Sequence, residues 1–295
     1  MLWDILPQGK SPGGAPMNVA VHLNRLGLDV RLISRTGDDP LGCQLKKYLD
    51  SVNFSNYYLQ QDTLHSTGTA QVDMSNPDEL QYDFPDSAWD YIELDHELRS
   101  LADRSDIIVH GSLIARMPGS FDVLRQLIAD ENKYKVFDVN LRYPHYSKQL
   151  IQQLFEKADM VKMNASELQI VSDWFVESSD EAGLMRQLRD RFHCKVISVT
   201  HGKDGASLLY EDNYLWHPGY KTDVVDTVGA GDAFLAGLLD GILKGNGNDS
   251  WKILDDAVAL GAYVSGLKGA NPFYYKTDIE QFKKSREPKD SHRKR

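Results

Sequence analysis

The sequence contains few cysteines and no long hydrophobic run. Its two cysteines, Cys43 and Cys194, lie far apart in no metal-ligand spacing, which argues against a disulfide framework or a zinc motif and predicts a reducing, cytoplasmic compartment. No stretch of about 18 apolar residues occurs, so we expect no membrane-spanning helix. The amino-terminal letters MLWDILPQGK also lack the basic and apolar parts of a secretion signal.

An excess of positive charge is also missing. The formal net charge is −10 at pH 7, whereas nucleic acids and anionic membranes select basic surfaces. We therefore expect a small-molecule partner, and neither nucleic acid nor membrane. The 295 residues, of which 41% are hydrophobic, suffice for one large α/β domain with a small insertion.

Short β-branched segments alternate with amphipathic ones from the middle of the chain onward. Strands are predicted at 107–111, 135–140, 159–164 and 195–200, and helices near 119–131, 147–157 and 181–192. This alternation indicates βαβ units, whose right-handed crossovers cover both faces of a sheet. The expected fold is a three-layer α/β/α sandwich around a mostly parallel sheet, with ligands at the carboxyl ends of its strands.

Two segments depart from this alternation. Residues 57–85 are polar with patchy alternation, which predicts a small β excursion, either a lid or an ordinary surface hairpin. The final letters KKSREPKDSHRKR predict a solvated basic tail. The expected organisation is one domain over 1–280, with lid insertions near 1–15 and 57–90, and a tail over 281–295.

The stretch DTVGAGDAF, residues 226–234, places two glycines directly before an apolar helical pattern. A broad apolar face follows over 234–243, and Gly245 marks the expected helix end. First-turn amides of a helix lack internal acceptors and lie at the positive end of its dipole, and glycine lets an anion approach the main chain. The glycines are therefore predicted to form a phosphate-binding turn between a strand and a helix.

Asp232 adds a carboxylate to this predicted anion site. It could be an ordinary helix cap, for which Asp is favoured. Beside a bound phosphate it could instead deprotonate an attacking hydroxyl, as phosphoryl transfer requires. Other phosphate motifs are absent, because the chain has no GxxxxGK[ST], HRD or DFG string and carries Phe234 where a dinucleotide fingerprint needs Gly or Ala.

Two long motifs give the chain a family resemblance. DTVGAGDAFLAG resembles the carboxyl-terminal signature of the ribokinase-like (PfkB) carbohydrate kinases, and GGAPMNVAVHLNRLG (13–27) resembles their amino-terminal signature. The likeness extends over nearly the whole chain, and GGAP, FDVNLR (137–142) and HGSLIA (110–115) are most similar to fructokinases. The resemblance implies ATP-dependent phosphorylation of a sugar hydroxyl by an α/β sandwich with a β lid.

The resemblance also implies the catalytic residues. Asp232 matches the family's catalytic base, and the amides of Gly229, Ala230 and Gly231 match its anion hole for the transferred phosphate.

Sugar-binding residues are implied in the amino-terminal half. Asp4, Gly14 and Asn18 match the family's sugar-binding positions, although Asn18 taken alone could be a helix cap. Arg142 follows a predicted strand end and could pair with a phosphate or contact an acidic or furanose substrate, with a surface ion pair as the alternative. Relatives acting on keto-deoxy sugar acids also place arginine here, which leaves those acceptors open.

Nucleotide and Mg²⁺ contacts are implied by two further motifs. NASE (164–167) resembles the family's NxxE, whose Asn164 and Glu167 would organise Mg²⁺ largely through water, but the same letters can form a helix capping box. THGKDG, with Thr200, Gly202 and Gly205, resembles the turn that lines the nucleotide phosphates, and an ordinary hairpin is its alternative.

A loop near the carboxyl terminus completes the resemblance. LKGANPF (267–273), with Asn271, resembles the loop beside the adenine and the monovalent-cation site, and Asp226 matches a cation-site position. Phe273 replaces the small residue often found in this loop, which leaves potassium activation open.

The expected function is that of a cytoplasmic fructokinase that uses ATP and Mg²⁺, and K⁺ if the cation site is kept. Another acceptor, such as a keto-deoxy sugar acid, another furanose or a nucleoside, and a catalytically silent binding protein are the alternatives. One departure weakens the Asp4 assignment, because relatives begin with a strand and a GE pair before the segment equivalent to LWD. Either the start is truncated, or the sheet lacks a strand that the family buries, which would leave an unpaired sheet edge. A homodimer through the lid is a further family-level expectation.

Overall fold

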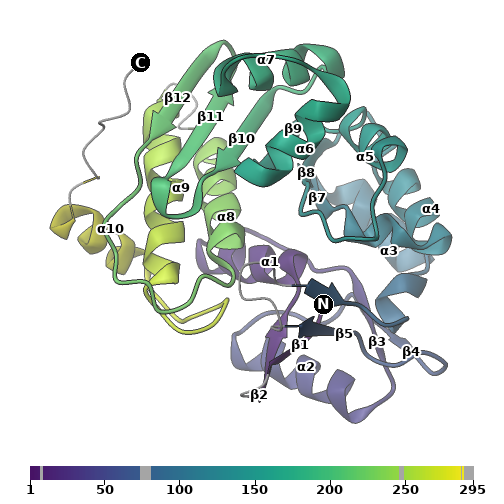
Figure 1. The fold of residues 1–295 in the computed structure, drawn as a ribbon. Helices are drawn as coiled ribbons and strands as arrows, with labels where there is room; N and C mark the ends of the chain where they lie inside the picture. The colour runs from purple at the N-terminus through teal and green to yellow at the C-terminus, as the bar shows by residue number, and fades with distance from the viewer. Residues whose placement is uncertain (7–8, 74–80, 246–248, 287, 289–295) are drawn as a thin grey trace. The chain divides into compact units, whose positions relative to one another are not determined.

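The protein forms two compact units. The computed structural model describes residues 1–6, 9–73, 81–245, 249–286 and 288. The first unit comprises Met1–Met17 and Arg31–Lys157, and the second comprises Asn18–Val30 and Ala158–Arg295. Helix α1 (Ala15–Arg25) contributes residues to both (Figure 1).

A small sheet in the first unit contains the strands β1 (Leu2–Leu6), β2 (Gly9–Gly13), β5 (Thr69–Asp73) and β6 (Gln81–Asp83). In the order β2-β1-β5-β6, β1 is antiparallel to β2 and parallel to β5, and β5 is antiparallel to β6. Leu2, Ala70 and Phe84 form a small core cluster of this unit. All four strands fall within the segments 1–15 and 57–90, where a β excursion was predicted, and residues 7–8 and 74–80 lie outside the described ranges.

The remaining elements of the first unit form parallel strand pairs with helices. The strands are β3 (Ser34–Gly37), β4 (Leu59–Asp62), β7 (Ile107–Gly111) and β8 (Tyr134–Asp138), and the helices are α2 (Pro40–Ser51), α3 (His96–Arg104), α4 (Pro118–Leu127) and α5 (Lys148–Phe155). β3 runs parallel to β4, and β7 parallel to β8. Among the described strands β7 pairs only with β8, so it is an edge strand of this sheet, and Ile107, Ile108 and Val109 are half-buried.

The second unit continues the strand–helix alternation. Its strands are β9 (Met160–Asn164), β10 (Val196–Thr200), β11 (Ala206–Tyr210) and β12 (Asn213–His217), and its helices are α6 (Ala165–Phe175), α7 (Glu181–Phe192), α8 (Ala230–Leu243), α9 (Ser250–Ser265) and α10 (Lys276–Ser285). β9 and β10 are parallel, whereas β10, β11 and β12 form an antiparallel meander. The predicted strands at 159–164 and 195–200 are confirmed to within one residue.

Helices cover both faces of the second unit's strands. Every side chain from Met160 to Met163 and from Val196 to Val199 is buried, although successive side chains in a strand point to opposite faces. α6 and α7 pack against β9–β11, and α9 packs against β11 and β12. α8 in turn packs closely on α9, because a Cβ atom at Gly237 would lie 2.9 Å from the Cα of Ala257. Among the described residues no helix is long and apolar enough to cross a bilayer.

Near the carboxyl end, the structure departs from the predicted secondary structure. The strand expected directly before the glycine turn is wrong, because residues 221–229 belong to neither helix nor strand. The main-chain amides of Val225 and Asp226 instead donate to the carbonyl of Ser265 at the end of α9, at 2.9 and 3.2 Å. The predicted tail over 281–295 begins inside α10, and residues 287 and 289–295 lie outside the described chain.

The half-buried carboxylate of Asp255 links α9 to β12 and α10. Asp255 accepts hydrogen bonds from His217 and Tyr220 and pairs with Lys283. Burial alone would raise the pKa of Asp255, but these bonds outweigh it and hold the pKa well below its usual range. Such a carboxylate stabilises the fold above the pKa of the unfolded chain, about 3.9, and loses that contribution as the pH falls.

We expect Asp255→Asn to lower the free energy of unfolding at pH 7 by about 1–3 kcal/mol, because it removes a charge-assisted bond and leaves Lys283 without this partner. Urea unfolding at pH 7 and pH 3.5 measures the effect, which should shrink at the lower pH. The exposed Asp212 offers the control Asp212→Asn. Equal losses for both variants would contradict the assigned role of Asp255.

Candidate active site

The predicted phosphate-binding turn lies at the start of α8 in the second unit. Gly229 precedes the helix with φ +78°, in the left-handed region that favours glycine. A Cβ atom at this position would lie 2.6 Å from the Cα of Ala270, so only glycine fits. Among the described residues no side chain caps the helix, although the Ala230 amide makes a long bond of 3.3 Å to the carbonyl of Thr227. The amides that follow in the first turn have no intrahelical acceptor, which suits an anion.

Asp232 is the third residue of α8, and its carboxylate is not a cap of that helix. Its Oδ2 atom accepts a hydrogen bond of 2.8 Å from Nδ2 of Asn18. Asn18 lies inside α1 with 4% of its surface exposed, so the helix-cap interpretation of Asn18 is also wrong. The two residues are 214 positions apart in the sequence, and each had been assigned a separate role. The structure joins them directly.

Lys162 is a candidate residue that sequence reasoning missed. It lies in the middle of β9 and is 7% exposed. A Cβ atom built on Gly231 would lie 3.3 Å from its Nζ atom, which places the ammonium group beside the first turn of α8. The signal was present in the sequence, because a lysine lies among the apolar residues in the middle of the predicted strand DMVKMN. Its ammonium group therefore places a positive charge beside the first turn of α8, where the sequence predicts a phosphate.

Three of the predicted nucleotide residues line a cavity of about 420 Å³ in the same unit. The residues that line it are Asn164, Ala165, Ser166, Thr200, His201, Gly202 and Asp204. Asn164, Thr200 and Gly202 are thus brought together as the motifs NASE and THGKDG predicted. Glu167 and Gly205 belong to the same motifs but do not line the cavity, so their proposed contacts stay predictions.

Asn164 and Glu167 form the capping box that was the alternative to a metal site. The Glu167 amide donates to Oδ1 of Asn164 at 2.8 Å, and the Asn164 amide donates to Oε2 of Glu167 at 2.9 Å. Within the described ranges no cluster of three or more His, Cys, Asp or Glu residues could hold a metal ion. Mg²⁺ usually keeps several waters and needs only one or two carboxylates, so a water-mediated contact of Glu167 with Mg²⁺ stays a prediction.

The THGKDG segment is also the hairpin turn that was considered as its alternative. Gly205 connects β10 to β11 with φ +94°, and a Cβ atom there would lie 1.8 Å from the carbonyl oxygen of His217. Gly205 is therefore required for the turn itself. Gly202 has φ +57° and open space around it, so its requirement is conformational.

The carboxyl-terminal loop contacts the glycine turn at several points. Asp226 accepts from the Val228 amide through Oδ1 and from the Gly269 amide through Oδ2, each at 3.0 Å. Asn271 donates from Nδ2 to Oδ1 of Asn18 at 2.7 Å. Phe273 is 67% exposed. Asp226 and Asn271 therefore hold main-chain and side-chain groups of the site together, and their predicted cation and nucleotide contacts stay predictions.

The remaining predicted residues lie in the first unit, where Asp4 sits in β1. A Cβ atom on Gly13 would come within 1.9 Å of a carboxylate oxygen of Asp4, so the glycine leaves room for this side chain. Gly14 has φ +104° and packs against the main chain of Met1. Burial raises the pKa of Asp4 to about 6, and the positive charge of Arg142 lowers it in part. Asp4 and Arg142 are thus linked electrostatically.

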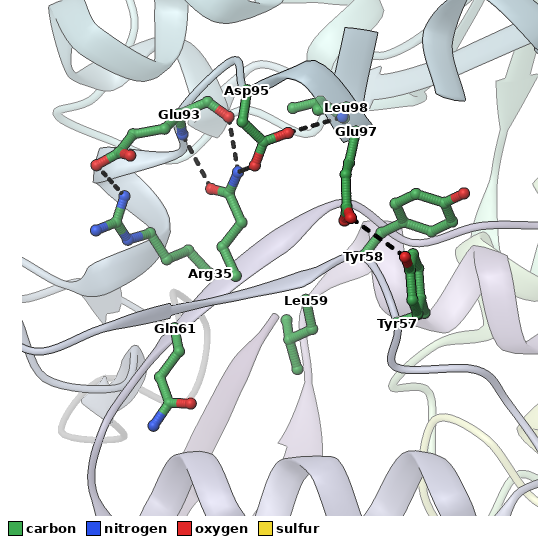
Figure 2. Close-up of a pocket in the computed structure, with 10 residues that line it drawn as sticks. Arg35, Tyr57, Tyr58, Leu59, Gln61, Glu93, Asp95, Glu97 and Leu98 are labelled. Atoms are coloured by element: carbon green, nitrogen blue, oxygen red, sulfur yellow. Dashed lines mark hydrogen bonds and ion pairs between the residues drawn. The ribbon is translucent and has the colours of Figure 1, made fainter. Parts of the chain in front are cut away.

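A second cavity, of about 330 Å³, also lies in the first unit (Figure 2). None of the residues predicted from the sequence lines it. Gln60 donates to the carbonyl of Glu93 and to Asp95, and Tyr57 donates to Glu97. The polar groups of this cavity thus pair with one another, apart from the candidate residues.

The environment of Asp4 generates a prediction that does not depend on activity. Carbon-13 NMR of the Asp4 carboxyl group should show a midpoint near pH 6. Arg142→Gln should move this midpoint upward, since it removes the charge that favours the carboxylate. A midpoint near pH 4 in the wild type, or a downward shift in the variant, would contradict the described environment.

Comparisons with known proteins agree over nearly the whole chain. Residues 8–276 match the pfkB family of carbohydrate kinases. A fructokinase of Klebsiella pneumoniae is 30% identical over 298 residues, which cover 94% of this chain and 95% of the relative. An uncharacterised sugar kinase from Pyrococcus horikoshii, solved in complex with ATP, superposes with a TM-score of 0.82 at 26% identity and 96% coverage of each chain.

A fructokinase from Vibrio cholerae, solved with fructose, ADP and a potassium ion, has a TM-score of 0.81 at 26% identity and 95% coverage of each chain. The fold is thus the α/β sandwich of the ribokinase-like sugar kinases, with its small β sheet, as the sequence predicted. The family match, the fold and the glycine turn with its aspartate agree. The chain therefore belongs to the pfkB family of carbohydrate kinases.

Proposed function

We propose that this protein transfers the γ-phosphate of ATP to a hydroxyl group of fructose. The observation that carries the proposal is the start of α8, where open first-turn amides, the buried Lys162 and the carboxylate of Asp232 occur together. Full-length similarity to fructokinases supports fructose as the acceptor. Asp4 and Arg142 supply a carboxylate and a guanidinium group, which suit sugar hydroxyls.

The proposed reaction is a single displacement at phosphorus. Asp232 accepts the proton of the sugar hydroxyl as its oxygen attacks the γ-phosphorus, the bond to the bridging oxygen of ATP breaks, and ADP leaves with that electron pair. The amides at the start of α8 stabilise the negative charge on the transferred group. Lys162 adds a positive charge beside the same amides. No covalent intermediate with the protein is needed.

Metal ions would act beside this machinery. Bound Mg²⁺ would neutralise charge on the ATP phosphates, and Glu167, with Asn164, would hold it through water. We assign the proposed K⁺ to the region of Asp226, whose carboxylate already ties the glycine turn to Gly269.

The base role of Asp232 gives a direct test of this function. Asp232→Asn should reduce turnover by about 10² to 10⁴, because the amide cannot accept the proton. The fructose KM should change much less. Coupled ADP release measures both, with fructose compared against a keto-deoxy sugar acid, ribose and a nucleoside.

Three outcomes would contradict parts of the proposal. Turnover of Asp232→Asn near the wild-type value would refute the base. A higher kcat/KM for another acceptor would replace fructose. The absence of ADP formation with every acceptor would favour a silent binding protein.

Lys162 gives a second prediction. Lys162→Met should reduce kcat by about 10² to 10³, the range seen when one charge-stabilising group is removed from a transition state. Lys135→Met is a matched control, because Lys135 is an equally buried strand lysine whose Nζ atom donates to the carbonyl of Asp130. Single-turnover phosphoryl transfer measures the effect. Equal losses for the two variants would assign Lys162 a structural role.

A further inference from the structure

Asp232 ends a hydrogen-bonded chain of two amide side chains. Asn271 donates to Asn18 at 2.7 Å, and Asn18 donates to Oδ2 of Asp232 at 2.8 Å. Asn18 is 4% exposed, so water does not compete freely for its amide group. All three residues belong to the second unit.

The carboxylate of Asp232 sets the direction of both hydrogen bonds. An ionised carboxylate can only accept hydrogen bonds, so Asn18 must turn its NH₂ group toward Asp232. The carbonyl oxygen of Asn18 then faces Asn271, which must turn its own NH₂ group inward. As a result, Oδ1 of Asn271 is buried without a hydrogen-bond partner in the described part of the chain. That cost is tolerated because a flipped amide would set two acceptor oxygens against each other.

The loop that carries Asn271 is fixed independently of this chain. His22 bonds to the carbonyl of Ala270 at 3.0 Å and to the hydroxyl of Tyr274 at 2.9 Å. Arg25 donates to the carbonyls of Asn271 and Pro272. Asn18, His22 and Arg25 are spaced four and three residues apart, so one face of α1 holds the whole loop. Asn271 therefore presents its amide from a rigid support.

We infer that Asn18 and Asn271 are positioning residues, which hold the carboxylate of Asp232 in the orientation that accepts the sugar proton. This inference rests on the proposed function. Asn18 fixes the carboxylate directly, and Asn271 fixes the amide orientation of Asn18. Cooperative polarisation along the chain strengthens both bonds. Asn271 thus acts as a positioning residue, a role that its place in the loop at 267–273 did not suggest.

The isosteric variant Asn271→Asp tests this inference. The new carboxylate cannot donate, so the amide of Asn18 is drawn toward it and the carbonyl of Asn18 turns toward Asp232. We expect kcat to fall about 10- to 100-fold, the value of one hydrogen bond to a charged group. The KM values for ATP and fructose should stay within about twofold, a change of less than about 0.5 kcal/mol.

The decisive comparison uses the Asp232→Asn background. There residue 232 can donate an amide proton to the carbonyl of Asn18, so the reversed chain is satisfied and Asn271→Asp should cost little or nothing. When a substitution no longer lowers kcat in the background of another, the double-mutant cycle shows that the two residues act through each other. Residual phosphoryl transfer under single-turnover conditions supplies the measurement in this background.

Two further variants keep the test decisive. Tyr274→Phe removes an anchor of the same loop without touching Asn18 or Asp232, and it should leave kcat nearly unchanged. If Asn271→Asp lowers the thermal unfolding midpoint, Asn271→Leu replaces it, and its kcat loss should likewise vanish in the Asp232→Asn background.

An equal fall in kcat in the wild-type and Asp232→Asn backgrounds would overturn the inference. A raised KM for ATP in place of a lowered kcat would also overturn it. A wild-type kcat for Asn271→Asp would overturn it as well. Failure of the proposed function is distinguishable, because it would appear as absent phosphoryl transfer in the wild type or as full turnover of Asp232→Asn.

Discussion

The first turn of α8 is the constraint on which the site depends. Gly229 adopts a left-handed conformation against Ala270 with no space for a side chain, and among the described residues no side chain caps the helix. The positive end of the helix is thereby kept open to an anion. The close packing of α8 on α9 holds this turn in place, because it fixes the helix near its middle at Gly237. The proposed anion site therefore lies on the helix whose packing holds this unit together.

Positive and negative groups lie together around this turn. Lys162 and the helix amides favour a negative group, whereas Asp232 places a negative charge within the same turn. A carboxylate in this position is useful if its proton affinity matters for the reaction, and Asn18 satisfies it by donating a hydrogen bond. The same turn can thus hold an anionic donor and keep an acceptor hydroxyl close to a base.

Local sequence patterns predicted β7 to β10, their alternation with helices and the glycine turn, because each follows from residues adjacent in the chain. Long-range side-chain partners were not predictable in this way. Asn18 reaches Asp232 across 214 positions, and Lys162 meets Gly231 only after β9 and α8 are packed together. The strand expected before the glycine turn is absent because the amides of Val225 and Asp226 bind the end of α9, a tertiary contact that overrides β-branched propensity.

The account's central claim is that main-chain amides at the start of α8 receive the transferred phosphoryl group while Asp232 faces the acceptor oxygen. A crystal structure with ADP, Mg²⁺, fluoroaluminate and fructose tests it most directly, because the fluoroaluminate imitates the phosphoryl group in transit. We predict fluoride atoms within hydrogen-bonding distance of the Gly231 amide and a fructose hydroxyl within hydrogen-bonding distance of Asp232. Fluoroaluminate bound away from this turn, or Asp232 directed away from the sugar, would contradict the account.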